Sequence, residues 1–255
     1  MASAVGDRAI TCRLNRQLRM FRVLTARGNA LGSGGFGVSI GEEAKTETEE
    51  SNEMQDPKQN IYLFPEEALF LHQRCYLQIY DEDHEHEGAH GILDTSQLFE
   101  MLPGLGMSIP MYLVYCHLRN QDFRILRHSP DRYKFLKKQQ DGAVSTTTKR
   151  EVRATIRNAP APRIIPEMNT DIQISWDAYK PSSDFAKTHP GLPDFYVAVA
   201  YYQQPTVTFQ QLHHLLASKC HGIPLKVATV SDSGTVNMYG ITSDGIPAIS
   251  KSGGA

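Results

Sequence analysis

The clearest pattern of apolar and polar residues lies in the last third of the chain. Residues 171–176 place Ile172, Ile174 and Trp176 on one face, and this period of two predicts a half-buried strand. Residues 195–202 form a continuous apolar run rich in aromatic and β-branched side chains. Such a run predicts a central strand that is buried on both faces.

A helix and a hairpin are predicted to follow these strands. The sequence Thr208-Phe-Gln-Gln211 has the form of a capping box, and leucines follow it at helical spacing up to Gly222. Residues 225–230 and 235–241 are strand-like and flank a short loop that ends in glycine. We therefore expect residues 167–250 to form an α/β domain, a mixed sheet with a helix packed on one face.

The middle of the chain, residues 61–132, predicts a helical N-terminal domain. Helix starts are expected at Pro65, Asp94 and Pro110, each followed by apolar residues at helical spacing. A short alternating strand is expected at residues 123–128. The predicted fold class is therefore α+β or α/β, a helical unit followed by a mixed sheet with a packed helix.

The other segments predict little regular structure. Residues 1–60 are expected to be poorly ordered, and residues 133–166 form a basic linker with repeated prolines. The four cysteines lie far apart and are interpreted as reduced core thiols. No apolar run reaches the roughly 18 residues that a membrane helix requires. The acidic loop at residues 81–87 is interpreted as a polar loop, so we expect no metal site and no cofactor.

The net charge of −2 conceals a strong asymmetry along the chain. Residues 1–27 hold six arginines and one acid, a pattern that a mitochondrial transit peptide also has. Residues 41–100 hold sixteen acids and three bases, and we interpret them as a solvated face. Residues 117–163 hold twelve bases and four acids, and such a positive surface attracts nucleic acid. The candidate phosphate-binding residues in and beside this segment are Arg119, Arg124, Arg127, Arg132, Lys134, Lys137 and Lys138.

Several segments resemble a known family in the same order along the chain. Residues 62–70 contain the sequence Pro-Glu-Glu-Ala-Leu, and residues 112–128 contain His-Leu-Arg before a basic strand. Residues 158–162 and 174–249 complete the set, the latter with Asp-Ala-Tyr, His-Pro-Gly and Thr-Val-Asn-Met-Tyr sequences. Together they resemble subunit 54 of the tRNA-splicing endonuclease.

The resemblance implies that this chain does not cut RNA itself. The related cutting subunits use a Tyr, a His and a Lys to promote attack of a 2′-hydroxyl on the adjacent phosphate. Tyr179 stands at the Tyr position of that pattern, but residues 193–195 and 223–224 stand where the His and the Lys are expected. We therefore expect no catalytic residue in this chain.

The resemblance also implies a place for the chain in the cell. It would be a structural subunit of a nuclear heterotetramer that binds pre-tRNA and supports intron removal, with catalytic and structural subunits of the endonuclease as partners. Strands near the C-terminus would add to a partner's sheet. The residues expected at this partner interface are Val236, Met238, Tyr239 and Ile241.

Two alternative functions remain open at this point. In one, the chain is an active tRNA endoribonuclease that uses Tyr179, His189 and Lys226. In the other, it is a nucleic-acid-binding adaptor unrelated to splicing. The placement of these three side chains in the fold bears on the first alternative, because a joint reaction requires them to converge.

Overall fold

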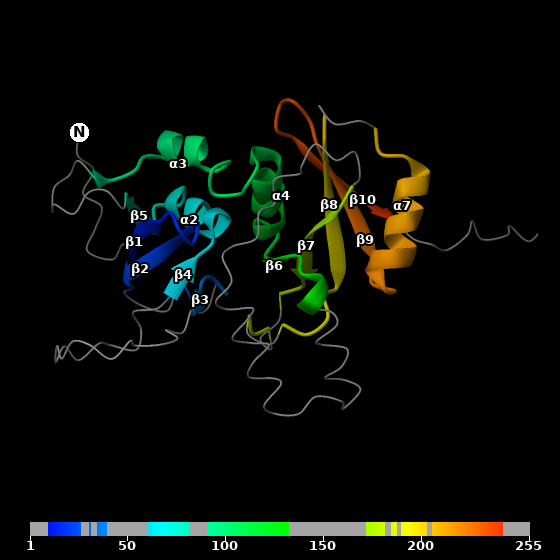
Figure 1. Ribbon diagram of the computed structural model, residues 1–255, viewed down its shortest axis with the longest axis horizontal. Helices are drawn as coiled ribbons and strands as arrows, with labels where there is room; N and C mark the ends of the chain where they lie inside the picture. Colours follow the sequence, from blue (N-terminus) through cyan, green and yellow to red (C-terminus); the bar gives the residue numbers. More distant parts are fainter. Residues whose placement is uncertain are drawn as a thin grey trace, which may run out of the picture.

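Two five-stranded sheets and a small number of helices make up the described part of this mixed α+β protein. Figure 1 shows one sheet from the first third of the chain, another mainly from the last third, and α4 (Ile109–Arg119) between them. No described helix is long and apolar enough to cross a membrane. The structure is a computed structural model, and it describes residues 10–26, 31, 35–39, 61–81, 91–132, 172–181, 185–187, 190–202 and 206–241.

The N-terminal sheet has the strand order β3-β4-β2-β1-β5. Neighbouring strands are antiparallel, except that β1 and β5 run parallel. Their apolar residues join those of the helices in one hydrophobic core. The strands are β1 (Ile10–Asn15), β2 (Met20–Thr25), β3 (Val38–Ser39), β4 (Ile61–Leu63) and β5 (Leu77–Tyr80).

The hairpin of β1 and β2 supplies two neighbouring interior strands of this sheet. Ile10, Cys12 and Leu14 are buried, and the residues between them are half-buried. This alternation is typical of a strand with one face on a core. The prediction that residues 1–60 are poorly ordered is therefore wrong for residues 10–25.

The helix starts predicted in the middle of the chain are confirmed. They begin α2 (Pro65–His72), α3 (Thr95–Met101) and α4. Asp94 caps α3, since its side chain accepts a hydrogen bond from the backbone of Gln97 at 2.8 Å. Residues 61–132 were predicted to form a helical unit with one short strand. They also contain β4 and β5, which belong to the N-terminal sheet.

The C-terminal sheet has the order β10-β9-β8-β7-β6. The strands β8 and β9 run parallel and are connected through α7 (Phe209–Leu215) and a π-helical turn, η2 (Leu216–Cys220), which confirms the predicted helix. The hairpin of β9 and β10 is also confirmed. The strands are β6 (Arg124–Arg127), β7 (Ile174–Tyr179), β8 (Phe195–Tyr201), β9 (Leu225–Val230) and β10 (Val236–Ile241).

A β-bulge in β7 changes which face its residues occupy. Ile174 is paired with Ala198 and Trp176 with Val197, so β7 advances by two residues where β8 advances by one. Trp176 therefore belongs to the core beneath α4, whereas Ile174 packs against the cluster beneath α7. The prediction that these two side chains share one face is wrong, and β7 is buried on both faces rather than one.

Two ion pairs connect α2 to the C-terminal half of the chain. Arg127 of β6 donates from Nη2 to Glu66 at 2.5 Å, and both side chains are almost completely buried. Lys187 pairs with Glu67, which also accepts hydrogen bonds from the backbone of Phe64 and Gly37. The two glutamates of α2 therefore join this helix to β6 and to Lys187, and Glu67 also bonds to Gly37 in the N-terminal part of the chain.

Candidate functional site

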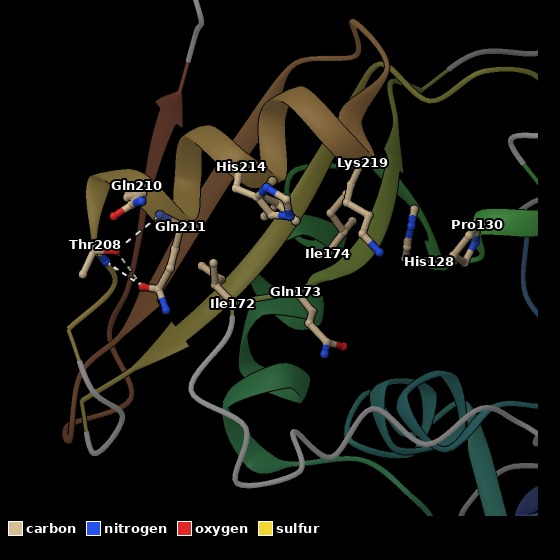
Figure 2. Close-up of a pocket in the computed structure, with 11 residues that line it drawn as sticks. His128, Pro130, Ile172, Gln173, Ile174, Thr208, Gln210, Gln211, His214 and Lys219 are labelled. Carbon is tan, nitrogen blue, oxygen red and sulfur yellow. Dashed lines mark hydrogen bonds between the residues drawn. The ribbon is translucent and has the colours of Figure 1, made fainter.

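A pocket of about 590 Å³ lies on the α7 face of the C-terminal sheet, over the start of β7. In Figure 2 its lining side chains come from α7, from the residues around β7 and from the segment after β6. This volume is within the range of small-molecule sites. The lining residues are His128, Pro130, Ile172, Gln173, Ile174, Thr208, Gln210, Gln211, His214, Leu215 and Lys219.

The pocket combines an apolar floor with cationic and imidazole groups. Ile174 and Leu215 supply apolar surface, and His128, His214 and Lys219 supply nitrogen atoms. None of the described lining residues is Asp or Glu. This lining favours an anion, because ammonium and imidazole groups can donate hydrogen bonds to it and no lining carboxylate repels it.

A buried carboxylate holds His128 at the wall of the pocket. Asp177 of β7 is 2% exposed, and its Oδ1 lies 2.6 Å from Nδ1 of His128. Its Oδ2 accepts from Arg132 at 2.6 Å, and Arg132 also donates to the backbone oxygen of Arg127 at 3.0 Å. The ring of His128 makes an edge contact with Tyr196. Contacts on two sides therefore fix the orientation of this imidazole.

The residues of the alternative catalytic set do not converge in the described structure. Tyr179 and Asp177 lie on the same face of β7, opposite the face that carries Trp176 and Ala178. Lys226 lies on the α4 face of the sheet, with its Nζ 3.9 Å from the ring centre of Phe195. The tyrosine and the lysine thus extend from opposite faces. His189 is outside the described residues.

Tyr179 itself is placed for packing. It is 4% exposed, contacts Phe185, and its hydroxyl donates a long hydrogen bond of 3.5 Å to the backbone oxygen of Gly191. Burial, and after it the negative charge of Asp177, raise the pKa of Tyr179 well above its ordinary value. A phenol in this environment stays protonated near neutral pH, which disfavours a role as a general base.

Two of the candidate phosphate-binding residues form a partly exposed basic pair. Arg119 donates to the backbone oxygen of Phe123 at 3.1 Å, and its guanidinium lies 4.3 Å from the ring centre of Phe36. Burial, and next the positive charge of Arg119, lower the pKa of Arg124 below its ordinary value. Because Arg119 bonds to the residue directly before Arg124, both half-buried guanidinium groups lie where α4 meets β6, with the carboxylate of Asp122 nearby.

The other predicted phosphate contacts are placed differently. Arg127 is 5% exposed and paired with Glu66, so its expected place on an RNA-binding surface is corrected to a buried structural one. Arg132 is half-buried and directed at Asp177. Lys134, Lys137 and Lys138 lie outside the described residues, as does the predicted linker.

The predicted partner-interface residues all lie on β10, the edge strand of the C-terminal sheet. Val236 and Met238 are half-buried against the core beneath α4. Tyr239 and Ile241 lie on the opposite face of the strand, and Tyr239 is 56% exposed. Among the described strands only β9 pairs with β10, which leaves its outer edge without a described partner strand.

Sequence reasoning missed the pair of His128 and Asp177. A usable signal was present, because Asp177 is a charged residue inside an apolar strand and such a residue requires a buried partner. His128 directly follows the basic strand β6, and its backbone N–H donates a hydrogen bond to the backbone oxygen of Ser175 in β7.

The described residues contain no group of three or more His, Cys, Asp or Glu side chains that could hold a metal ion.

Comparison with known proteins does not identify a family for this chain. No protein-family model and no curated protein matches the chain.

Proposed function

We propose that this protein is a non-catalytic structural subunit of the tRNA-splicing endonuclease, active in tRNA processing in the nucleus. In this role it binds pre-tRNA and holds the catalytic subunits, which excise the intron. The proposal begins from the ordered sequence resemblance of residues 62–70, 112–128, 158–162 and 174–249 to subunit 54 of that enzyme.

The observation that carries the proposal is the edge strand β10. An edge strand presents backbone donors and acceptors that a partner's strand can pair with, and alternate side chains give such pairing its specificity. Tyr239 and Ile241 extend from the face of β10 away from the α4 core, and Tyr239 is largely exposed. An exposed aromatic residue on an edge with no described partner strand suits a hetero-oligomeric interface.

Separation of Tyr179 and Lys226 supports a role without catalysis. Cleavage by 2′-hydroxyl attack requires a base, an acid and a cation around one phosphate. These two side chains lie on opposite faces of the sheet, and the hydroxyl of Tyr179 is buried. The cutting groups would therefore come from a partner chain.

Positive groups near α4, β6 and α7 support contact with RNA. Arg119 and Arg124 are partly exposed side by side, and Lys219 lies at the pocket beside His128. Such groups position a nucleic-acid backbone without reading its sequence. This is the contribution to pre-tRNA binding expected of a structural subunit.

Recovery of partners from cells tests the proposal directly. The tagged full chain should co-purify with the catalytic subunits of the tRNA-splicing endonuclease, identified by mass spectrometry. Tyr239→Asp should reduce that recovery by about tenfold or more, because it places a charge at the proposed interface. Tyr76→Asp is the matched control, since Tyr76 is 57% exposed but lies away from β10.

Three outcomes of this experiment are informative. Loss of the subunits with Tyr239→Asp and retention with Tyr76→Asp supports the edge strand as the interface. Equal recovery with both variants removes β10 from the proposal. Recovery of no endonuclease subunit with the unmodified chain contradicts the proposed function as a whole.

A further inference from the structure

The pocket beside α7 has two chemically different ends. Figure 2 shows Lys219 and His128 at one end and Gln210 at the other. Ile172 and Ile174 lie between these ends. Gln210 and Lys219 are nine positions apart on α7 and η2, which corresponds to roughly 13 Å along a helix axis. The pocket therefore suits an elongated ligand with an anionic group at one end and hydrogen-bonding groups at the other.

The β-bulge in β7 brings two parts of this site to the same face of the sheet. Residues three apart on a regular strand face opposite sides. Because of the bulge, Ile174 packs against the cluster beneath α7, and Asp177 faces the same side, opposite Tyr196 of that cluster. Bulges occur often beside functional sites, where they change the direction of a side chain. Here the bulge places both the apolar floor and the carboxylate that holds His128.

The backbone that carries the lysine is also irregular. Lys219 lies in η2, a π-helical turn, and such turns are rare in proteins and frequent at functional sites. The turn is followed by His221, a non-glycine residue in the left-handed region with φ of 51°. A left-handed backbone at such a residue costs energy. Irregular backbone on two sides of the pocket indicates a binding site rather than a gap in the packing.

The basic end of the pocket suits a phosphate monoester. The charge of Asp177 is balanced by Arg132, which bonds to its Oδ2 at 2.6 Å. His128 contacts Asp177 through Nδ1, so Nε2 is the ring nitrogen that can contact a ligand, and both nitrogens donate when the ring is charged. Lys219 is exposed and adds an ammonium group. A phosphate monoester carries up to two negative charges and three acceptor oxygens, which match these donors.

The rest of the pocket matches a nucleoside. Ile172 and Ile174 are half-buried and offer apolar surface to a base or a sugar ring. Gln210 is exposed, and its amide has both donors and an acceptor, the combination with which glutamine binds the edges of bases. The volume of about 590 Å³ is within the range of pockets that hold a small molecule.

We propose that the α7 pocket binds a single nucleotide that carries a phosphate monoester, with His128 and Lys219 as phosphate contacts and Gln210 as a contact to the base. A free mononucleotide and the phosphorylated end of an RNA strand both offer this chemistry. The second source rests on the proposed function in pre-tRNA binding, whereas the first does not. Nucleotide binding by the purified chain is measured without partners, so its failure is distinguishable from a failure of partner recovery.

Isothermal titration calorimetry with the purified full chain tests the site. AMP should bind at least about tenfold more tightly than adenosine, because adenosine lacks the charged hydrogen-bond acceptor. Lys219→Gln should weaken AMP binding by about tenfold for the same reason. Gln210→Ala should weaken binding of AMP but not of ribose 5-phosphate, which has no base.

Two adenylate trinucleotides, one with a 5′-phosphate and one with a 5′-hydroxyl, distinguish the sources. The phosphorylated trinucleotide should bind more tightly than the hydroxyl form. If it also binds more tightly than AMP, the end of an RNA strand is the ligand. If AMP binds as tightly or more tightly, the ligand is a free nucleotide.

A matched variant and circular dichroism separate binding from folding. Lys180→Gln removes the same charge from a side chain that is 72% exposed and is not among the lining residues, so it should bind AMP like the unmodified chain. Equal affinity for AMP and adenosine, or equal losses in Lys219→Gln and Lys180→Gln with both variants folded, would overturn the site. Equal binding of the two trinucleotides would assign the contact to the RNA backbone instead. Absence of binding by both AMP and the phosphorylated trinucleotide would also refute the proposal.

Discussion

The two sheets of this protein differ in how many of their faces are covered. The C-terminal sheet packs against α4 on one face and against α7 on the other, and β8 is accordingly buried over most of its length. Among the described residues, the N-terminal sheet has a core on one face, and its strand β1 alternates between buried and half-buried residues. The described part of the C-terminal sheet is therefore covered on both faces, whereas the other face of the N-terminal sheet carries half-buried and exposed residues.

The largest effect that this comparison predicts is the loss of stability when a carboxylate is placed on either face of β8. Ala198 and Val199 are adjacent in β8 and belong to the cores beneath α7 and α4 respectively. Ala198→Asp and Val199→Asp should each lower the free energy of unfolding by more than about 4 kcal/mol, because each buries an unpaired carboxylate. Urea unfolding followed by circular dichroism measures the change.

The N-terminal sheet supplies the control for this experiment. Gln78 of β5 is half-buried on the outer face, level with Thr11. Gln78→Asp should change the free energy of unfolding by less than about 1 kcal/mol, since its carboxylate remains in contact with water. A small effect of Ala198→Asp would show that α7 does not cover its face, and the comparison between the sheets would then be lost.

The connection between the two halves gives the next largest effect. Removal of Glu66 leaves the guanidinium of Arg127 buried without its carboxylate, and breaking a buried pair in this way costs about 3–5 kcal/mol. Glu66→Ala should therefore lower the free energy of unfolding by that amount. Restoration of stability in the double variant Glu66→Ala, Arg127→Met would assign the loss to the unpaired charge.

An exposed ion pair provides the control for Glu66. Arg16 pairs with Asp81 at 2.9 Å, but its side chain is 52% exposed. Arg16→Ala should alter stability by less than about 1 kcal/mol, because solvent screens the pair. Equal losses of stability in Arg16→Ala and Glu66→Ala would mean that burial does not make the pair of Glu66 and Arg127 more important for stability than an exposed pair.

The sequence pattern was sufficient for the fold where local signals agree with burial. The capping residues Asp94 and Thr208 and the hairpin of β9 and β10 follow from local chemistry, and the structure contains all three. It was not sufficient for β1 and β2, where the arginines dominate the composition and hide an alternation of apolar residues. The bulge in β7 was also beyond prediction, because it depends on pairing with β8 rather than on the residues of β7 alone.

The candidate sites depend on contacts between residues that are far apart in the sequence. The pairing of His128 with Asp177 joins the residue after β6 to β7 across a long connection. Arg127 was predicted as a surface residue from charge alone. Its burial follows from Glu66 in α2, which a count of charges along the chain cannot reveal.

The helix cap of α7 gives the smallest effect and tests what makes the C-terminal sheet two-sided. Thr208 accepts a hydrogen bond from the backbone of Gln211 at 3.3 Å, and the Gln211 side chain accepts from the backbone of Thr208 at 2.9 Å. Thr208→Ala should lower the free energy of unfolding by about 1 kcal/mol, since one backbone donor of the first turn loses its partner. Thr206→Ala removes a nearby threonine outside the cap and should have little effect. An equal loss in both variants would mean that the cap does not hold α7 over the sheet, and that packing of Leu215 and Cys220 does so alone.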